Sequence, residues 1–387
     1  MAYTSTFSPC TGLFARYHWN GYRYDGRTKT TVAVIRNAFM KFEPRFESII
    51  NNVFNGRGPD KEECVYLLGF DPHSLESTHM MSIANDICRK RSGNAGIIYA
   101  QIGIDVRPCS SNCQFCAFAE EHFNLQPKRM DMQEISECVH ALADAGDLYG
   151  LFLMTIHDFD MDHLLEAVKV TRSILPSYAP VWVNVGDISV KQAKRLKDAG
   201  VEGAYHALRL REGEDTNLDP KERLKTFDAI RQAGLSLYMC CEPIGPEHSA
   251  QEIVDRVFLS LEYETIQLSA MRRALVPHLP ISERGQTSQL RLAQITAILT
   301  LISVSYPQVA SVACHEPNLL GLTAGSNVVA VEIGANPRDD VTNTAENRGL
   351  SINDCRRMLF EAGYTSIMTS DLNLIPLTAE YLRKFGA

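Results

Sequence analysis

Between Ala95 and about Gly334 the sequence alternates short apolar stretches with amphipathic stretches of helical spacing. Regular alternation of these two kinds of segment is typical of parallel strands joined by helices that cover the sheet. The predicted strands are residues 95–104, 149–156, 180–185, 202–208, 235–242, 264–270, 308–314 and 327–333. The predicted helices are residues 131–146, 160–174, 189–199, 221–233, 249–261 and 286–305, with a short connection after the seventh strand. Eight strands in this order predict an α/β protein with a complete TIM-type (β/α)8 barrel rather than an open sheet of six strands.

Two further regions flank the predicted barrel, which spans residues 95–334. Residues 1–94 read as a helical N-terminal extension, with helices expected at Thr30–Asn55, Lys61–Leu68 and Glu76–Arg91 between Gly and Pro breaks. Residues 335–387 include a helix at 351–362 and are expected to cap the barrel or lie against its outer helices.

Three cysteines follow the first predicted strand. Cys109, Cys113 and Cys116 have the spacing C-x3-C-x2-C, and Phe115 precedes the last of them. Loops at the carboxyl ends of barrel strands carry the active site in this fold. Three thiolates can bind one iron–sulfur cluster and leave one iron open to a substrate or cofactor. A structural zinc site is the alternative, although such sites need a second pair of ligands and none follows at a suitable spacing.

Composition limits the partners of the chain. Its 387 residues, 45% of them hydrophobic, suffice for one large barrel with terminal additions. The net charge of −8 gives no basic surface for nucleic acid. The chain has no run of eighteen apolar residues and its first residues do not resemble a signal peptide, so we expect a cytoplasmic protein without a membrane partner. Its eleven cysteines are then thiols and cluster ligands rather than disulfides, and an exposed iron requires an anaerobic or strongly reducing setting.

The cysteine motif resembles the signature of the radical S-adenosylmethionine (SAM) superfamily, C-x3-C-x-aromatic-C. The resemblance implies a 4Fe–4S cluster on Cys109, Cys113 and Cys116, and SAM bound to the open iron. One electron, from a reductant such as flavodoxin or ferredoxin, would cleave SAM to methionine and a 5'-deoxyadenosyl radical. Order and spacing between about Gly93 and Asp340 are similar to the biotin synthase branch, which includes an iron-hydrogenase maturase and methylornithine synthase.

The same resemblance implies which residues contact SAM. Arg209, Glu212 and Arg223 match the polar groups of the branch that meet its ribose, amino group and carboxylate, and a guanidinium is well suited to a carboxylate. Without the resemblance, Arg223 reads as one of several solvated helix charges. The superfamily places a Gly-Gly-Glu motif after the second strand, where this chain has Thr155 between Met154 and Ile156. Other expected cofactor contacts are Phe115 and the turn that begins at Ile244.

A second cluster is possible from the remaining cysteines. Biotin synthase holds an auxiliary cluster with three strand cysteines and an arginine, but two of the matching positions here are approximately Leu153 and Trp182. Cys240 or Cys241 on the fifth strand could instead approach Cys314, although only one of the adjacent pair can face the barrel interior. The alternative is that all three are core residues. The cysteines expected to be structural are Cys10, Cys64, Cys88, Cys138 and Cys355.

The predicted activity is hydrogen abstraction from a small-molecule or carrier-bound substrate, for which the barrel excludes water. Sulfur insertion in cofactor biosynthesis is the expected reaction if an auxiliary cluster exists. The alternatives are a radical rearrangement, metallocofactor maturation, or a zinc-binding or electron-carrier protein. Polar residues at strand ends that could contact substrate are His157, Asp158, Asn184, Asp187, Gln267, Arg272 and Arg273, of which the arginine pair suggests an anionic group.

Overall fold

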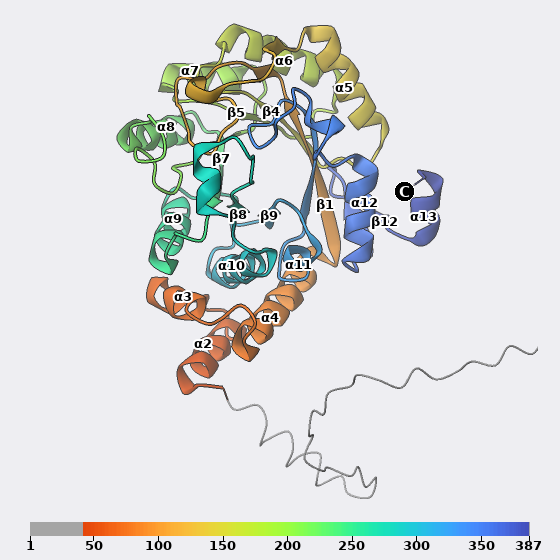
Figure 1. Cartoon of the computed structure of the whole chain (residues 1–387). Coiled ribbons are helices and arrows are strands. Elements are labelled where there is room, and N and C mark those ends of the chain that lie inside the picture. The colour runs from red at the N-terminus through yellow and green to blue at the C-terminus, as the bar shows by residue number, and fades with distance from the viewer. Residues whose placement is uncertain (1–41, 387) are drawn as a thin grey trace, which may run out of the picture. The chain divides into compact units, whose positions relative to one another are not determined.

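The computed structural model describes residues 42–386, and a compact unit begins at Pro44. Within this range eight parallel strands close into a barrel (Figure 1). They are β1 (Ala95–Gly103), β4 (Gly150–Met154), β5 (Val181–Asn184), β6 (Gly203–Tyr205), β7 (Ser236–Ile244), β8 (Gln267–Arg272), β9 (Ser311–His315) and β10 (Val328–Gly334). Closure occurs at β1, where Tyr99 is in register with Gly150 of β4 and with Ala330 of β10. The complete (β/α)8 barrel is therefore confirmed.

A helix follows each of the first seven barrel strands, β1 and β4 to β9, and covers the outside of the barrel (Figure 1). These helices are α5 (Met132–Asp144), which follows β1 after the cysteine loop, and then α6 (Met161–Ile174), α7 (Val190–Asp198), α8 (Pro220–Gln232), α9 (Ala250–Glu262), α10 (Gln289–Ile302) and α11 (Leu319–Leu322). Asp131, Ser189 and Ser249 begin three of them with capping boxes, which satisfy backbone N–H groups of the first turn. The single turn of α11 is the short connection predicted after the seventh strand.

Along each strand the side chains point alternately outward, to the core between strands and helices, and inward, to the core inside the barrel. Ile98, Ala100 and Ile102 of β1 pack outward against the helices, whereas Ile97 and Tyr99 face the barrel axis. Inside, aromatic rings fill the barrel toward the amino ends of the strands. Ring centroids lie 5.0 Å apart for Tyr99 and Trp182, and 4.6 Å apart for Trp182 and Tyr238. With Phe152 these rings form the floor beneath the open carboxyl end.

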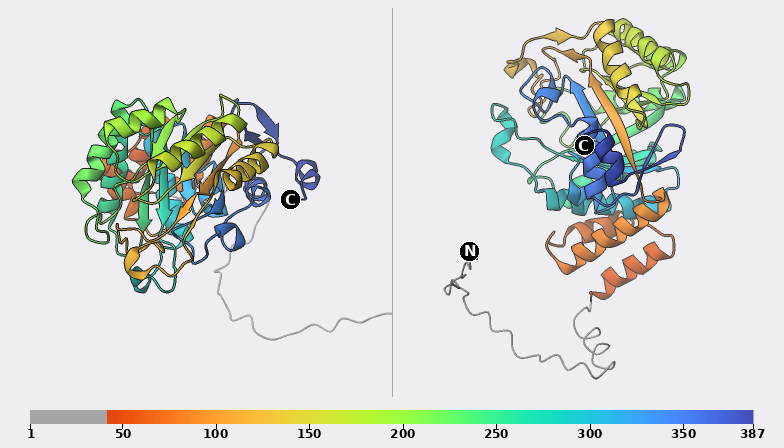
Figure 2. Two further views of the ribbon diagram at one scale, coloured as in Figure 1. Left: turned by 90° about the horizontal axis from the view of Figure 1, so that it is seen from above. Right: turned by 90° about the vertical axis from the view of Figure 1, so that its right-hand side faces the viewer.

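The N-terminal helices pack on one side of the barrel (Figure 2). They are α2 (Pro44–Phe54), α3 (Lys61–Leu68) and α4 (Leu75–Ser92). Helix α4 packs on α10 and α3 on α9. The first predicted helix, Thr30–Asn55, is thus seen from Pro44 onward, and its earlier residues, like Cys10, lie outside the described residues.

The C-terminal region has two parts. Residues 335–350, here called the C-terminal strap, follow β10 at the carboxyl end of the barrel. Beyond it lie α12 (Ile352–Glu361), β11 (Ser366–Met368), β12 (Leu374–Pro376) and α13 (Ala379–Lys384). Strand β11 extends the sheet by pairing in parallel with the start of β1, and β12 pairs antiparallel with β11, which the sequence analysis did not predict.

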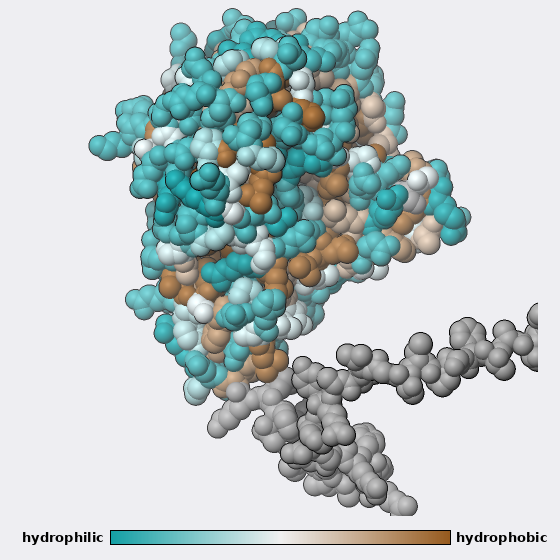
Figure 3. All heavy atoms as spheres, viewed as in Figure 1, coloured by the Kyte–Doolittle hydropathy of each residue, from teal (hydrophilic) through white to brown (hydrophobic). Residues whose placement is uncertain are grey.

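Short elements complete the structure. Strands β2 (Asp105–Val106) and β3 (Lys128–Arg129) form an antiparallel pair on either side of the cysteine loop. The 3₁₀ helices are η1 (Glu120–His122), η2 (Pro280–Arg284), η3 (Ser303–Ser305) and η4 (Thr344–Glu346). The face shown in Figure 3 is largely hydrophilic with scattered apolar patches. In residues 42–386 we find no helix with the length and apolarity needed to cross a bilayer.

Candidate active site

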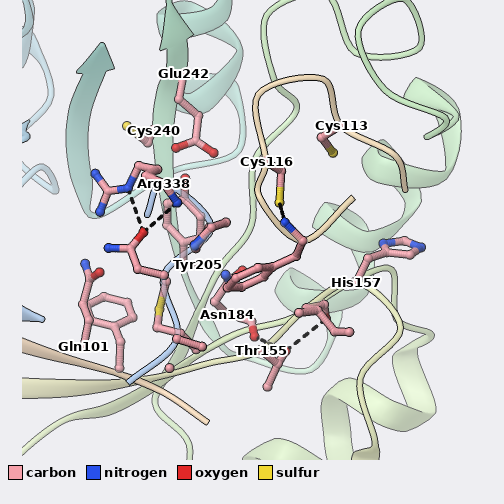
Figure 4. A pocket seen from close by; sticks show the side chains of 18 of the residues that line it. Gln101, Cys113, Cys116, Thr155, His157, Asn184, Tyr205, Cys240, Glu242 and Arg338 are labelled. Carbon is pink, nitrogen blue, oxygen red and sulfur yellow. Dashed lines mark hydrogen bonds between the residues drawn. The ribbon is translucent and has the colours of Figure 1, made fainter. Parts of the chain in front are cut away.

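A cavity of about 180 Å³ opens at the carboxyl ends of the barrel strands. All eight barrel strands contribute to its wall, including Gln101 of β1, Tyr205 of β6 and Glu242 of β7. Cys109, Cys113 and Cys116 also line it. Figure 4 shows Cys113 and Cys116 on one side of the cavity and Gln101, Cys240 and Arg338 on the other. The predicted position of the site, at the carboxyl end of β1, thus coincides with this cavity.

Backbone hydrogen bonds hold the cysteine loop in place. Within the loop, Cys109 N–H donates to Phe118 O (2.8 Å) and Cys116 N–H to Cys113 O (3.0 Å). Two further bonds tie it to neighbouring segments, since Gln114 N–H donates to Asp215 O and Ala117 N–H to Pro337 O of the strap. The thiols are therefore presented by a loop that is fixed from both sides.

The donor set of this loop suits a metal cluster. Burial raises the pKa of the Cys113 thiol and raises that of Cys116 to about 12. A buried thiolate needs a compensating cation, which a metal supplies when the thiol loses its proton. Phe118 N–H donates a hydrogen bond to Cys116 Sγ at 3.4 Å (Figure 4). The same N–H group would stabilise a thiolate that binds a metal. Three such thiols facing one cavity fit a cluster with three protein ligands.

Asp158, in the loop after β4, supports the cysteine loop. Its carboxylate accepts hydrogen bonds from Ser110 N–H (2.7 Å) and Ser110 Oγ (2.9 Å). These bonds lower its pKa against the opposing effect of burial. Asp158 does not line the cavity, so the structure places it behind the loop rather than at the substrate.

Arg209 and Arg223, the two arginines predicted to bind SAM, both lie on the cavity wall. Arg209 Nε is 3.1 Å from Glu242 Oε1, and its guanidinium carbon is 5.9 Å from the centroid of the Phe115 ring. Thr155, also on the wall, donates from Oγ1 to Asn184 O at 2.6 Å. Phe115, Thr155, Arg209 and Arg223 thus all line the same cavity.

Glu212 and Ile244 are not on the wall. Glu212 is buried behind the arginines, where its Oε2 accepts from Arg209 N–H (2.9 Å) and lies 3.7 Å from Arg223 Nε. It therefore orients both arginines and does not face the cavity itself. Ile244 is also buried, and its carbonyl accepts from Arg273 N–H. Neither Glu212 nor Ile244, both expected near a cofactor, is therefore among the residues that line the cavity.

Arg223 belongs to a buried network with Asp187 and His206. Its Nη1 donates to Asp187 Oδ1 (3.0 Å) and its Nε and Nη2 donate to Ala207 O. His206 Nε2 lies 3.5 Å from the same Asp187 oxygen. Burial would raise the pKa of Asp187, but hydrogen bonding to His206 and the charge of Arg223 lower it well below its usual value. Asp187, predicted as a substrate contact, therefore holds Arg223 in place.

Acid should weaken the fold through His206. Burial lowers its pKa to about 3, with a smaller contribution from Arg223, so the folded protein keeps the ring neutral. The unfolded chain gains a proton below about pH 6.5, and stability present above that pH is lost as pH falls toward the folded value. For His206→Asn, which keeps a donor for Val185 O, we expect the slope of unfolding free energy between about pH 6 and pH 5 to fall by about 1.4 kcal/mol per pH unit. Urea unfolding at several pH values measures this slope, and an unchanged slope would contradict the assignment.

The two arginines predicted to bind an anion are engaged elsewhere. Arg273 makes a two-pronged ion pair with Glu247, with both N–O distances at 2.7 Å. Arg272 donates to Thr287 O and lies 3.7 Å from Glu316. Neither lines the cavity. The remaining predicted contacts, His157, Asn184 and Gln267, do line it.

Comparison with known proteins gives relatives of one kind. No family model matches the chain. It is 24% identical over 274 residues to a biotin synthase of Persephonella marina, spanning 67% of this chain and 79% of the relative. Among solved structures, the FeFe-hydrogenase maturase HydG from Carboxydothermus hydrogenoformans superposes with a TM-score of 0.69 at 16% identity, covering 92% of this chain and 85% of that one. Methylornithine synthase (PylB) gives 0.66 at 14% identity, covering 81% and 94%. The solved structures establish the fold, and the biotin synthase of Persephonella marina matches in sequence over about two thirds of this chain.

The chain resembles the biotin synthase-like radical SAM enzymes in sequence and in fold. Relatives of this kind imply, in general, a 4Fe–4S cluster and SAM. In residues 42–386 we find no group of three or more His, Cys, Asp or Glu side chains arranged to hold a metal ion.

The three cysteines considered for an auxiliary cluster do not face one common site. Cys240 lines the cavity, but Cys241 points outward with its Sγ 3.8 Å from Ile253 O of α9. Cys314 also points outward, with its Sγ 3.5 Å from Asn318 Nδ2 at the start of α11. Strand alternation is the reason, since the neighbours Cys240 and Cys241 must face opposite sides. The structure therefore does not bring the three possible auxiliary ligands together around the cavity. Leu153, which the sequence analysis matched to a cluster ligand of biotin synthase, points outward from β4. Its neighbour Phe152 is the residue whose side chain faces the barrel interior.

The remaining described cysteines lie in helices, as expected of structural residues. Cys64, Cys88, Cys138 and Cys355 belong to α3, α4, α5 and α12.

Several polar wall residues were missed by the sequence analysis. Gln101 and Glu332 are single polar residues in otherwise apolar strands, a signal that could have identified them. Others come from strand ends or from the strap, where no periodic pattern indicates direction. They are Tyr205, Glu242, His315, Asn336 and Arg338.

Proposed function

We propose that this enzyme binds a 4Fe–4S cluster at Cys109, Cys113 and Cys116 and uses SAM to remove a hydrogen atom from a small molecule in the barrel. The observation that carries the proposal is the position of three thiols on one loop, all facing a cavity walled by eight strands. When bound, the cluster supplies the electron that cleaves SAM to methionine and a 5'-deoxyadenosyl radical. The enclosing wall keeps water from reaching the reacting molecule.

The residues proposed to bind SAM are Phe115, Thr155, Arg209 and Arg223. All four line the cavity, as do the three cysteines. A guanidinium can bind the SAM carboxylate with a pair of donors, and a carboxylate holds each arginine, Glu242 beside Arg209 and Asp187 beside Arg223. Glu212 acts as a positioning residue for both arginines.

The proposed reaction is hydrogen abstraction followed by rearrangement or cleavage of the substrate, without an auxiliary sulfur donor. Of the three cysteines considered for a second cluster, Cys240 alone faces the cavity. Sulfur insertion is a second candidate because the sequence relatives are biotin synthases. We also propose a flavodoxin or ferredoxin as electron donor and a reducing, oxygen-poor cytoplasm as the setting.

Anaerobic reconstitution with iron and sulfide tests the proposal. We expect about four irons per chain, one class of electron paramagnetic resonance signal, and formation of 5'-deoxyadenosine from SAM only when dithionite is present. Absence of 5'-deoxyadenosine from fully loaded protein would refute the proposed function. A second cluster signal, with about eight irons per chain, would favour sulfur insertion instead.

A further inference from the structure

Residues 212–217, in the loop between β6 and α8, hold the cysteine loop from one side. Asn217 N–H donates to Ser111 O at 2.8 Å, and Gln114 N–H donates to Asp215 O at 2.9 Å. Ser111 and Gln114 stand on either side of Cys113 in the sequence. The position of the Cys113 thiol therefore depends on where this segment lies.

The same segment orients the two arginines on the cavity wall. Glu212 Oε2 accepts from Arg209 N–H at 2.9 Å and lies 3.7 Å from Arg223 Nε. The other oxygen of Glu212, Oε1, accepts from Thr216 Oγ1 at 2.9 Å. Glu212 is thus held from within the segment. A shift of residues 212–217 would therefore move the cysteine loop and both arginines together.

One ion pair fastens this segment from outside. The Asp215 side chain is 5% exposed, and both of its carboxylate oxygens accept from Arg284 Nη1 of η2, at 2.9 and 3.0 Å. Among residues 42–386 we find no other side chain that bonds to this carboxylate. Loss of Arg284 would leave a buried charge without a partner, which is strongly unfavourable. The segment would then have to shift to bring Asp215 to water.

Arg284 is itself held by the loops that follow β7 and β8. Its Nη1 lies 3.9 Å from Glu247 Oε1, and Glu247 forms the two-pronged ion pair with the fully buried Arg273. Arg273 Nε also donates to Gly285 O, beside Arg284, at 3.1 Å. Glu247 would keep Arg273 as a partner if Arg284 were replaced. The electrostatic consequence of such a replacement therefore falls on Asp215.

We propose that Arg284 is a positioning residue for both the cluster and SAM, and that it acts through Asp215 and residues 212–217. Arg284 does not line the cavity, so its effect reaches the site through this segment. Without the ion pair, the cysteine loop releases iron faster and the two wall arginines bind SAM more weakly. This inference rests on the proposed function for the identity of the two ligands.

Iron retention and SAM affinity of the anaerobically reconstituted enzyme test the inference. Transfer of iron to the chelator bathophenanthroline disulfonate gives the rate of cluster loss, and the effect of SAM on the electron paramagnetic resonance signal of the reduced cluster gives its affinity. Arg284→Gln should lose iron at least about tenfold faster than wild type, as expected when an outer partner of a metal ligand is lost. Its SAM affinity should fall in parallel. Arg284→Lys should restore both, because one ammonium nitrogen can donate to both Asp215 oxygens, as Nη1 does.

Arg195→Gln is the matched control. Arg195 Nη2 of α7 lies 2.6 Å from Asp162 Oδ1 of α6, but the Asp162 side chain is 86% exposed, so water solvates its carboxylate when the arginine is lost. Neither residue lines the cavity. This variant should keep the iron retention and SAM affinity of wild type.

A second variant guards against misfolding. Asp215→Asn/Arg284→Gln removes both charges, so no buried carboxylate is left without a partner. Its unfolding midpoint shows whether it folds, and without the ion pair it too should lose iron faster than wild type. Iron release at the wild-type rate from either folded variant, or equal acceleration in Arg195→Gln, would overturn the inference. Iron content and SAM cleavage by the same wild-type sample report separately on the proposed function.

Discussion

Replacement of Cys113 by alanine is expected to abolish both iron binding and SAM cleavage. The chain supplies three thiols to the cavity from the cysteine loop, and the proposed cluster already has one iron without a protein ligand. The variant would leave a second iron without a protein ligand, and two thiols are then too few to retain the cluster. Loss of an outer partner of a metal ligand costs about 10- to 100-fold in activity, so loss of a ligand itself should lower 5'-deoxyadenosine formation by more than about a hundredfold.

The measurement compares iron content and 5'-deoxyadenosine yield after identical anaerobic reconstitution. Cys138→Ala is the matched control, because Cys138 lies on α5, away from the cavity, and packs at the edge of the outer core. It should retain full iron and full cleavage. Normal SAM cleavage by Cys113→Ala would show that this cysteine is not a cluster ligand.

Replacement of Asp147 by alanine should destabilise the barrel severely. Asp147, in the loop before β4, is fully buried and accepts from Arg356 Nε of α12 at 2.6 Å and from the Tyr381 hydroxyl at 2.9 Å. Arg356 is 2% exposed, so the variant would leave its charge buried without a partner. Breaking a buried ion pair in this way costs about 3–5 kcal/mol. Chemical denaturation of the cluster-free protein under anaerobic conditions measures the loss.

The neighbouring residue provides a control for this experiment. Arg357 lies 3.6 Å from Asp354, but the two side chains are 52% and 44% exposed. An exposed pair of this kind contributes about 0–1 kcal/mol, so Arg357→Ala should change stability little. Similar losses for Asp147→Ala and Arg357→Ala would contradict the importance given to burial.

The barrel could be predicted because each of its segments has a strong periodic pattern. The apolar run of β1 and the capped, amphipathic helices that follow it indicate both the type and the order of the elements. Strands β11 and β12 are three residues each and have no such pattern of their own. They are strands because the start of β1 extends beyond β4 and offers an unpaired edge, which is information from tertiary structure.

The sequence predicted the part of the candidate site that a motif marks, the cysteine loop. It did not predict the part that comes from the C-terminal strap, which is distant in the sequence. The cysteine spacing located the loop at the end of β1. The directions of Cys240 and Cys241 depend on strand register, which the sequence does not reveal. Arg338 was missed for a similar reason, since only the hydrogen bonds of the strap to Gly103 and Ala117 bring it to the cavity. Arg272 and Arg273, which are adjacent in the sequence and drew attention there, form ion pairs with Glu316 and Glu247 instead of facing the cavity.

The aromatic floor of Tyr99, Phe152, Trp182 and Tyr238 blocks passage through the amino end of the barrel. Within residues 42–386 the cavity therefore opens at the carboxyl end, beside the cysteine loop and the strap. Under the proposed function, substrates and products would share this opening, so a product would have to leave before the next substrate could enter.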